Sequence, residues 1–145
     1  NLYNYRAYPA SVAAYQEALP VLKPNGLFLQ MYGKALSMDE QHQKSNEVLA
    51  MARQRHNGQI IQNTLGNNHK TLGNYPEAEA AYLKSTQMVP SLLLPKYLLA
   101  KLYSESGQPQ KAQQTAEEIL NSTIKVESSA TREIMSEMKK IISYQ

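Results

Sequence analysis

Cysteine is absent from the 145 residues of this chain, which excludes disulfide bonds and thiol catalysis. The same absence fits an oxidising and a reducing compartment equally well. No apolar run reaches the roughly 18 residues that a membrane-spanning helix needs, and nothing resembles a signal peptide. An excess of basic charge is also missing, because a formal net charge of +3 is too small to predict a nucleic-acid-binding face.

Sequence signatures of catalysis, metal binding and cofactor binding are missing as well. The three histidines, His42, His56 and His69, lack an HExxH pattern and a carboxylate four residues further on. Neither a phosphate-binding glycine loop nor a GxSxG nucleophile motif occurs. Acidic pairs such as Glu77 and Glu79 are best explained as solvated charge on a helix surface. We therefore expect no catalytic residue, no cofactor and no metal site, in a chain that is not an enzyme.

What the chain does contain is internal repetition. Gly66 is followed by Ala100 34 residues later and preceded by Gly33 33 residues earlier, and Gly73 and Gly107 are again 34 apart. The stretch YPEAEAAY at residues 75–82 also matches YPASVAAY at residues 8–15, two such periods earlier. A period of about 34 residues with Leu-Gly, Ala-x3-aromatic and a late proline resembles the tetratricopeptide repeat, a helix–turn–helix unit.

This resemblance implies an all-α fold, a right-handed helical solenoid (an αα-superhelix) with about three full repeats. We expect a single domain over residues 1–145, with a leading half-repeat at 7–25 that supplies only a second helix. Full repeats are expected at 26–58, 59–92 and 93–126, followed by a C-terminal capping helix at 127–143. Residues 1–6 would be the remnant of a missing first helix, in a chain cut from a longer protein, and are expected to lack a fixed structure.

Small residues at matching places predict that the two helices of each repeat approach closely. They are Gly33, Gly66 and Ala100 on the first helices and Ser45, Ala78 and Ala112 on the second. Gly73 and Gly107 are expected to end first helices in a left-handed conformation. Pro9, Pro76 and Pro109 are expected in the first turns of second helices. Tyr15, Tyr82 and His69 occupy positions at which this repeat packs aromatic side chains.

After Val126 the repeat stops, and an amphipathic helix is predicted instead. Its apolar positions follow helical spacing, with Ser128 or Ser129 as the N-cap: Ala130, Ile134, Met138 and Ile141. The last repeat of a solenoid exposes an apolar face, so this helix is expected to cover it. The alternative is a helix that binds a membrane surface or a partner.

In the tetratricopeptide family the first helices line a concave groove, and the resemblance implies a set of groove residues here. Asparagine can hydrogen-bond a peptide backbone, and lysine can pair with a carboxylate or phosphate. A generic solvated inner face remains the alternative to a specific binding site. The Lys/Asn set with which chaperone-binding members hold a C-terminal carboxylate is incomplete. The expected groove residues are Gln30, Lys34, Asn63, Asn67, Lys70, Tyr97 and Lys101.

A closer resemblance rests on the stretches FLQMYGKALSM and MVPSLLLPKYLLAKLY and on a pattern near the C-terminus. That pattern is Lys125-Val126, Ser128, Ala130, Glu133 and Ile134. Together they resemble the C-terminal tetratricopeptide domain of bacterial membrane proteins of the O-antigen ligase/polymerase type. The resemblance implies a soluble appendage on the periplasmic side of the inner membrane, attached through the parent protein. The catalytic residues of that family lie in its membrane portion, and none transfers to this sequence.

From these observations we expect a non-catalytic protein–protein interaction or scaffold module with a protein or peptide partner in its groove. Two alternatives stay open. The chain could recognise an anionic glycan or lipid-linked carrier for the parent enzyme, through Lys34, Lys70 and Lys101. It could also be a structural or dimerising spacer. No nucleic-acid partner is expected, and a membrane is involved only through the parent protein.

Overall fold

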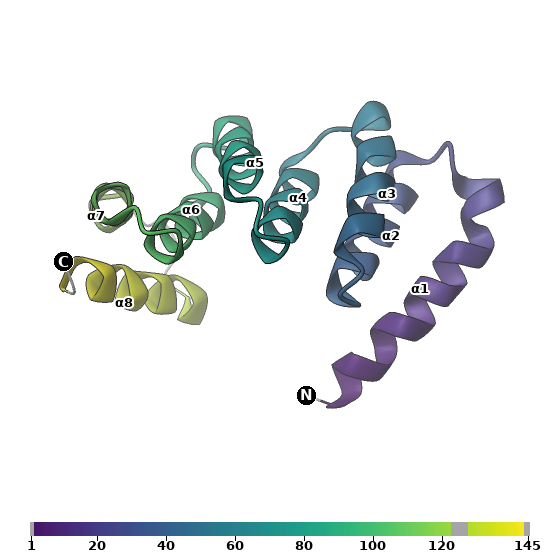
Figure 1. The fold of residues 1–145 in the computed structure, drawn as a ribbon, viewed down its shortest axis with the longest axis horizontal. Helices are drawn as coiled ribbons and strands as arrows, with labels where there is room; N and C mark the ends of the chain where they lie inside the picture. Colours follow the sequence, from purple (N-terminus) through teal and green to yellow (C-terminus); the bar gives the residue numbers. More distant parts are fainter. Residues whose placement is uncertain (1, 123–127, 144–145) are drawn as a thin grey trace. The chain divides into compact units, whose positions relative to one another are not determined.

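The described part of the computed structural model comprises residues 2–122 and 128–143, with side chains described from residue 7 onward. Within it the chain forms α-helices and no β-strand, which confirms the predicted all-α class (Figure 1). In chain order the helices are α1 (Leu2–Leu22), α2 (Gly26–Met38), α3 (His42–Arg55), α4 (Gln59–Thr71), α5 (Tyr75–Met88), α6 (Leu93–Glu105), α7 (Pro109–Leu120) and α8 (Ser129–Ser143).

Contacts divide the chain into two compact units, and the boundary falls inside α5. Unit 1 is Asn1–Ala81 and unit 2 is Tyr82–Gln145. Unit 1 holds α1 to α4 with the first half of α5, whereas unit 2 holds the second half of α5 with α6, α7 and α8. None of the helices in the described ranges combines the length and the apolar character needed to cross a membrane.

The same hydrogen-bonded turn ends α2, α4 and α6. In each turn, the backbone N–H three residues beyond the helix donates to a carbonyl in its last turn at 2.7–2.9 Å: Gln41 to Leu36, Asn74 to His69 and Gln108 to Tyr103. This Schellman pattern requires a left-handed residue just before the donor. Gly73 (φ 80°) and Gly107 (φ 73°) fill that position as the sequence predicts, whereas the first turn places Glu40 there (φ 64°).

The close approach of α2 and α3 depends on a small residue at position 33. A Cβ added to Gly33 would lie 2.4 Å from Leu49 Cδ2, a separation that side chains do not tolerate. The second small residue of this pair is also used, because Ser45 Oγ donates to the Gly33 carbonyl oxygen at 2.6 Å. For α2 and α3, the predicted role of paired small residues is therefore confirmed.

The core of unit 1 forms where α1, α2, α3 and α4 bury their apolar faces together. Tyr15 of α1 lies edge-on to Phe28 at 5.7 Å between ring centroids, and Tyr32 lies 5.9 Å from Tyr15. Tyr15 therefore has the packing role expected of it. The fully buried large side chains of this core are Leu29, Tyr32, Leu36, Leu49 and Ile61.

In unit 2, α8 covers α6 and α7, and these three helices lie side by side in Figure 1. Met138 is fully buried against Ala100, Ala116 and Ile119, with Ile134 and Ile141 partly buried around it. The helix begins with a reciprocal cap in which Thr131 N–H donates to Ser128 Oγ at 3.2 Å and Ser128 N–H donates to Thr131 Oγ1 at 2.8 Å. Ser128 is thus the N-cap.

Two sequence expectations about apolar and proline positions are wrong. Ala130 is exposed and takes no part in the buried stripe of α8, because it lies in the first turn, before the buried part of the helix. Pro9 does not begin a helix: α1 starts at Leu2 and continues through both Pro9 and Pro20. An internal proline costs a helix about 3 kcal/mol, but flanking alanines such as Ala7 and Ala10, with the highest helix propensity, offset part of that cost.

The backbone of residues 2–6 belongs to α1, and the expectation that residues 1–6 lack a fixed structure stays a prediction. The other two prolines behave as predicted. Pro76 is the second residue of α5 and Pro109 the first of α7, where a missing N–H costs no helical hydrogen bond. The expected repeat boundary at 126 and the start of the expected cap at 127 lie outside the described residues.

Candidate functional site

An open pocket of about 510 Å³ lies in unit 1, between α1, α2 and α4. Its wall is largely apolar and aromatic, and one cation, Lys34, stands in it. The lining residues are Tyr8, Ser11 and Tyr15 of α1, Gln30, Met31, Lys34, Ala35 and Met38 of α2, and Ile60 of α4. Pockets of this size and composition can hold a side chain or a short peptide segment.

Several apolar side chains of this pocket are open to solvent rather than buried in the core. Met31 is 48% exposed, Met38 51% and Ile60 39%. Lys34 is also exposed, and no carboxylate in the described part of the chain lies within ion-pair distance of it. Exposed apolar groups gathered around a charge are typical of interaction surfaces.

The predicted groove residues of unit 1 do not all reach this pocket. Gln30 and Lys34 line it, whereas Asn63, Asn67 and Lys70 do not. Asn63 is only 7% exposed, and its Nδ2 donates to Gln59 Oε1 at 3.0 Å, one turn earlier on the same helix. Its Oδ1 is buried without a hydrogen-bond partner among the described residues. One N–H of the Asn63 amide is therefore bound within α4 itself, and the assignment of Asn63 to a ligand site stays a prediction.

Asn67 is exposed on α4, and Lys70 is half-buried in its last turn. Each makes an interaction within the chain. Their assignment to a ligand site therefore stays a prediction.

A buried polar network that the sequence did not predict joins α2, α3 and α4. Asn68 is fully buried, and its Nδ2 donates to Ser45 Oγ and to Asn46 Oδ1, each at 2.9 Å. Its Oδ1 accepts from Ser37 Oγ at 2.6 Å and from His42 Nδ1 at 2.9 Å. Because an amide oxygen only accepts, Nδ1 of His42 must carry a hydrogen. All four hydrogen-bonding positions of the Asn68 amide are used, so this network is structural.

One signal in the sequence could have indicated this network. Asn68 lies three residues after Leu65 and seven after Ile61, on the same helical face as these buried apolar residues. A polar side chain at such a position must find partners inside the protein, because an unpaired buried amide costs about 1–3 kcal/mol.

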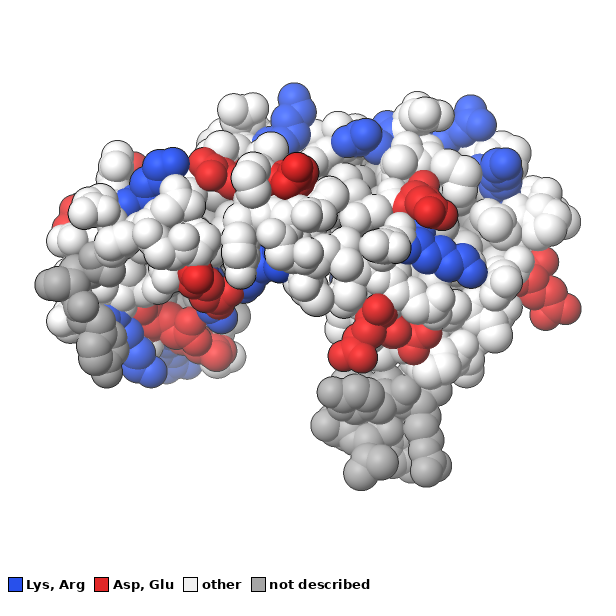
Figure 2. Space-filling model, viewed as in Figure 1, with Lys and Arg blue, Asp and Glu red and all other residues white. Residues whose placement is uncertain are grey.

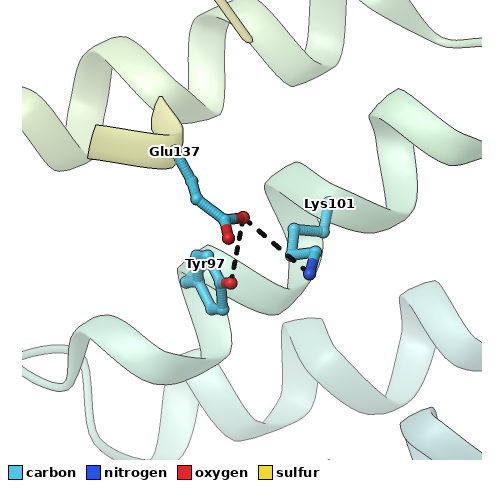
Figure 3. Close-up of polar contacts among 3 residues, drawn as sticks. All are labelled: Tyr97, Lys101 and Glu137. Carbon is cyan, nitrogen blue, oxygen red and sulfur yellow. Dashed lines mark hydrogen bonds and ion pairs between the residues drawn. The ribbon is translucent and has the colours of Figure 1, made fainter. Parts of the chain in front are cut away.

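In unit 2, the predicted residues Tyr97 and Lys101 meet one carboxylate (Figure 3). Tyr97 Oη donates to Glu137 Oε2 at 3.1 Å, and Lys101 Nζ lies 3.8 Å from the same oxygen. The ammonium also sits 5.4 Å from the centroid of the Tyr97 ring, within range of a cation–π interaction. Tyr97 and Lys101 are one turn apart on α6, whereas Glu137 belongs to α8.

Local electrostatics raise the pKa of both Tyr97 and Lys101. Burial raises the pKa of Tyr97, and its hydrogen bond to the Glu137 carboxylate raises it further. Burial alone would lower the pKa of Lys101, but interactions with Tyr97, Glu137 and Glu105 outweigh it and raise that pKa. Near neutral pH Tyr97 is therefore a neutral phenol and Lys101 an ammonium.

Charged side chains do not gather into a patch of one sign on the face of the molecule drawn in Figure 2. On the face that Figure 2 shows, basic and acidic side chains are interspersed. Across residues 2–122 and 128–143, no group of three or more histidine, aspartate or glutamate side chains is placed to hold a metal ion. In the described chain, the unit 1 pocket and the face of α6 that carries Tyr97 and Lys101 can each contact a ligand.

Comparison with known proteins gives a fold but no family. No protein-family model matches the sequence, and no curated protein matches it. Among solved structures, the crystal structure of MamA protein is similar, with a TM-score of 0.70 and 15% sequence identity. The match covers 94% of this chain and 80% of that chain. At that identity the similarity shows the fold alone, a tetratricopeptide-like array of helices packed in consecutive pairs.

Proposed function

We propose that this chain is a non-catalytic interaction module that binds an extended peptide segment in which a carboxylate lies beside apolar side chains. A tetratricopeptide-like fold supports a scaffold or interaction role in general, because such arrays present their first helices to partners. The observation that carries the specific proposal is the unit 1 pocket, where exposed Met31, Met38 and Ile60 surround Lys34.

The chemistry of that pocket favours a peptide over a highly charged ligand. Apolar side chains of the ligand would cover Met31 and Met38, and about 25 cal/mol is gained for each Å² of apolar surface removed from water. Lys34 would then pair with one carboxylate in a partly desolvated setting, where a charge pair adds orientation as well as affinity. A methionine-rich surface also adapts to more than one side-chain shape.

The anionic glycan carrier is the weaker candidate. It was expected to use Lys34, Lys70 and Lys101 together, but Lys101 is held by Glu137 and Lys70 also interacts within the chain. A phosphorylated sugar that bound the wild-type chain, and was released by salt or by changing all three lysines to alanine, would favour that alternative. A dimerising spacer would instead appear as a stable dimer in light scattering, without any peptide binding.

A peptide selection tests the proposal. The immobilised chain is used to select from a library of short random peptides, and we expect enriched sequences to carry an acidic residue next to an apolar one. For an enriched peptide, Lys34→Glu is expected to weaken binding about ten-fold, because an attraction is replaced by a repulsion. Met31→Ser should weaken it as well, by removing apolar contact.

Lys23→Glu is the matched control for Lys34→Glu. Lys23 is also an exposed lysine of unit 1, but it lies outside the pocket lining. Equal effects of the two charge reversals would show that only net charge matters and would contradict the proposal. Failure to enrich any peptide would contradict it too.

For the whole protein we propose the parent that the sequence resemblance implies, an O-antigen ligase/polymerase-like membrane protein with this module on the periplasmic side. The support is the pair of stretches FLQMYGKALSM and MVPSLLLPKYLLAKLY, of which the first forms most of α2. Reading the coding sequence around this chain tests the idea, since several apolar spans of about 20 residues are expected there. A coding sequence without such spans would contradict it.

A further inference from the structure

A hydrogen-bond donor on Tyr97 and the positive charge of Lys101 converge on one point. The phenol O–H and the ammonium both reach Glu137 Oε2, at 3.1 Å and 3.8 Å (Figure 3). We propose that these two residues form a carboxylate-binding subsite and that Glu137 occupies it in cis, in place of the carboxylate of a peptide ligand. The inference rests on the proposed function, since it concerns a second contact point for the same class of acidic peptide.

The donor pair fits a carboxylate for geometric reasons. Lys101 is held over the Tyr97 ring at 5.4 Å, so the ammonium and the phenol are directed to a common acceptor. Neither group is an anion near neutral pH: the phenol donates a hydrogen bond to one carboxylate oxygen at 3.1 Å, and the ammonium pairs electrostatically with the same oxygen at 3.8 Å.

An apolar side chain lies on the same face of α6 as this donor pair. Leu94 precedes Tyr97 by three residues and Lys101 by seven, and it is 48% exposed. A carboxylate flanked by an apolar side chain therefore matches α6, as it matches Lys34 with Met31 and Met38 on α2. The occupant to which the proposal commits is the acidic, partly apolar peptide already inferred for unit 1.

Glu137 can leave the subsite without moving α8. The Lys101 and Glu137 side chains are 36% and 33% exposed, and ion pairs open to solvent in this way are weak. The neighbouring residue, Met138, is fully buried and fixes α8 on α6 and α7 together with Ile134 and Ile141. A rotamer change of Glu137 alone would vacate the donors, so the carboxylate acts as a side-chain latch that lowers ligand affinity modestly, by about five-fold.

A titration followed by NMR tests the latch. The probe is N-acetyl-leucine, which has a carboxylate next to an apolar side chain, and N-acetyl-leucinamide is its uncharged counterpart. The ring resonances of Tyr97 and the side-chain CH₂ resonances of Lys101 report binding. We expect Glu137→Gln to respond at about five-fold lower N-acetyl-leucine concentration than the wild-type chain, since glutamine keeps the shape but loses the charge. The amide should shift neither residue.

Glu133→Gln is the matched control, because Glu133 is an exposed glutamate one turn earlier on α8 and the variant changes net charge equally. It should titrate like the wild-type chain. Equal midpoints for Glu137→Gln and the wild-type chain, or no response at Tyr97 in either, would overturn the proposal. If Glu137→Gln fails to fold by circular dichroism, Glu137→Asp serves instead, because its shorter side chain withdraws the carboxylate from Tyr97.

The outcome is independent of the test of the proposed function. Lys34→Glu and Lys23→Glu probe the pocket of unit 1 and leave Tyr97, Lys101 and Glu137 unchanged. Peptide binding lost through Lys34 with no response at Tyr97 would refute the latch alone. If N-acetyl-leucine shifts the Tyr97 resonances but the selection enriches no peptide, the subsite is supported and the proposed function is contradicted.

Discussion

Leu49 occupies the space that a side chain at Gly33 would need. The Cδ2 and Cγ atoms of Leu49 would lie 2.4 Å and 2.6 Å from a Cβ at position 33. Gly33 lies on α2, Leu49 on α3, and both are buried. The two helices of this pair are therefore as close as glycine allows.

Gly33→Ala is expected to destabilise the chain by about 1–2 kcal/mol. Overpacking costs about 1–3 kcal/mol, and the better helix propensity of alanine returns roughly 0.5–1 kcal/mol. Urea denaturation measures the change. In a Leu49→Ala background the clash is removed, so Gly33→Ala should become neutral or stabilising there. The same loss in both backgrounds would show that contact with Leu49 is not the cause.

Glu40→Gly is expected to stabilise the chain by about 1 kcal/mol, because a non-glycine residue pays roughly 1–2 kcal/mol to adopt a left-handed conformation. Glu40 has φ 64° at the position that Gly73 and Gly107 fill in the equivalent turns. Gly73→Ala is the reverse change and should destabilise by a similar amount. No atom lies within 4 Å of a Cβ at Gly73, so its cost would be conformational. Midpoints of chemical denaturation that move in the same direction for both variants would contradict this account.

Asn68→Asp is expected to be more destabilising than Asn68→Leu, although aspartate is closer in shape. The new carboxylate would face Asn46 Oδ1, an acceptor, where the wild-type Nδ2 donates at 2.9 Å. An unpaired buried charge costs about 3 kcal/mol or more, whereas leucine leaves Ser37, His42, Ser45 and Asn46 to find other partners. Thermal and urea unfolding measure the order of stability of the two variants. Similar stability of Asn68→Asp and the wild-type chain would contradict the network.

Stability should fall at alkaline pH, partly through Tyr82. Burial raises the pKa of Tyr82, and the negative charge of Glu105 raises it further. The folded chain then keeps a proton that the unfolded chain releases from about pH 10 upward, so the free energy of unfolding decreases as pH rises through that range. Urea denaturation at pH 8 and pH 11 should show a smaller loss for Tyr82→Phe than for the wild-type chain.

Tyr75→Phe is the matched control for this pH effect, since Tyr75 lies on the same helix but is 39% exposed. It should retain the full alkaline loss of the wild-type chain. An equal alkaline loss in Tyr82→Phe and Tyr75→Phe would show that the buried phenol does not contribute.

Features that depend on neighbours in the sequence could be predicted. The all-α class and the left-handed glycines, Gly73 and Gly107, follow from a local pattern that recurs every 34 residues. The left-handed conformation of Glu40 could not be predicted in this way, because the turn places a non-glycine residue in a conformation that it does not favour. For Pro9 the prediction of a helix start was wrong, because the preference of proline for the first turn does not exclude a helix that continues through a proline.

The parts of the candidate site that depend on contacts between residues far apart in the sequence could not be predicted. Gln30 and Lys34 lie one turn apart on the same face of α2, which helical spacing alone predicts, and both line the pocket. The sequence predicts that the C-terminal helix covers the last repeat, but not that Glu137 meets Tyr97 and Lys101, because the rotation and axial position of α8 against α6 depend on contacts between residues about 40 apart. Likewise, the hydrogen bond from the Asn63 amide to Gln59 depends on side-chain conformations that the repeat pattern does not specify.

Four hydrogen bonds at one buried amide also fix how three helices align along their axes. A slide of α4 by one helical turn, about 5.4 Å, would break every bond of Asn68 at once, whereas apolar side chains could find new contacts after such a slide. The network therefore discriminates between packings more than it adds to stability. A leucine at this place could leave unit 1 folded yet permit several alignments, which hydrogen exchange would register as lost protection in α4 before any drop in the unfolding midpoint.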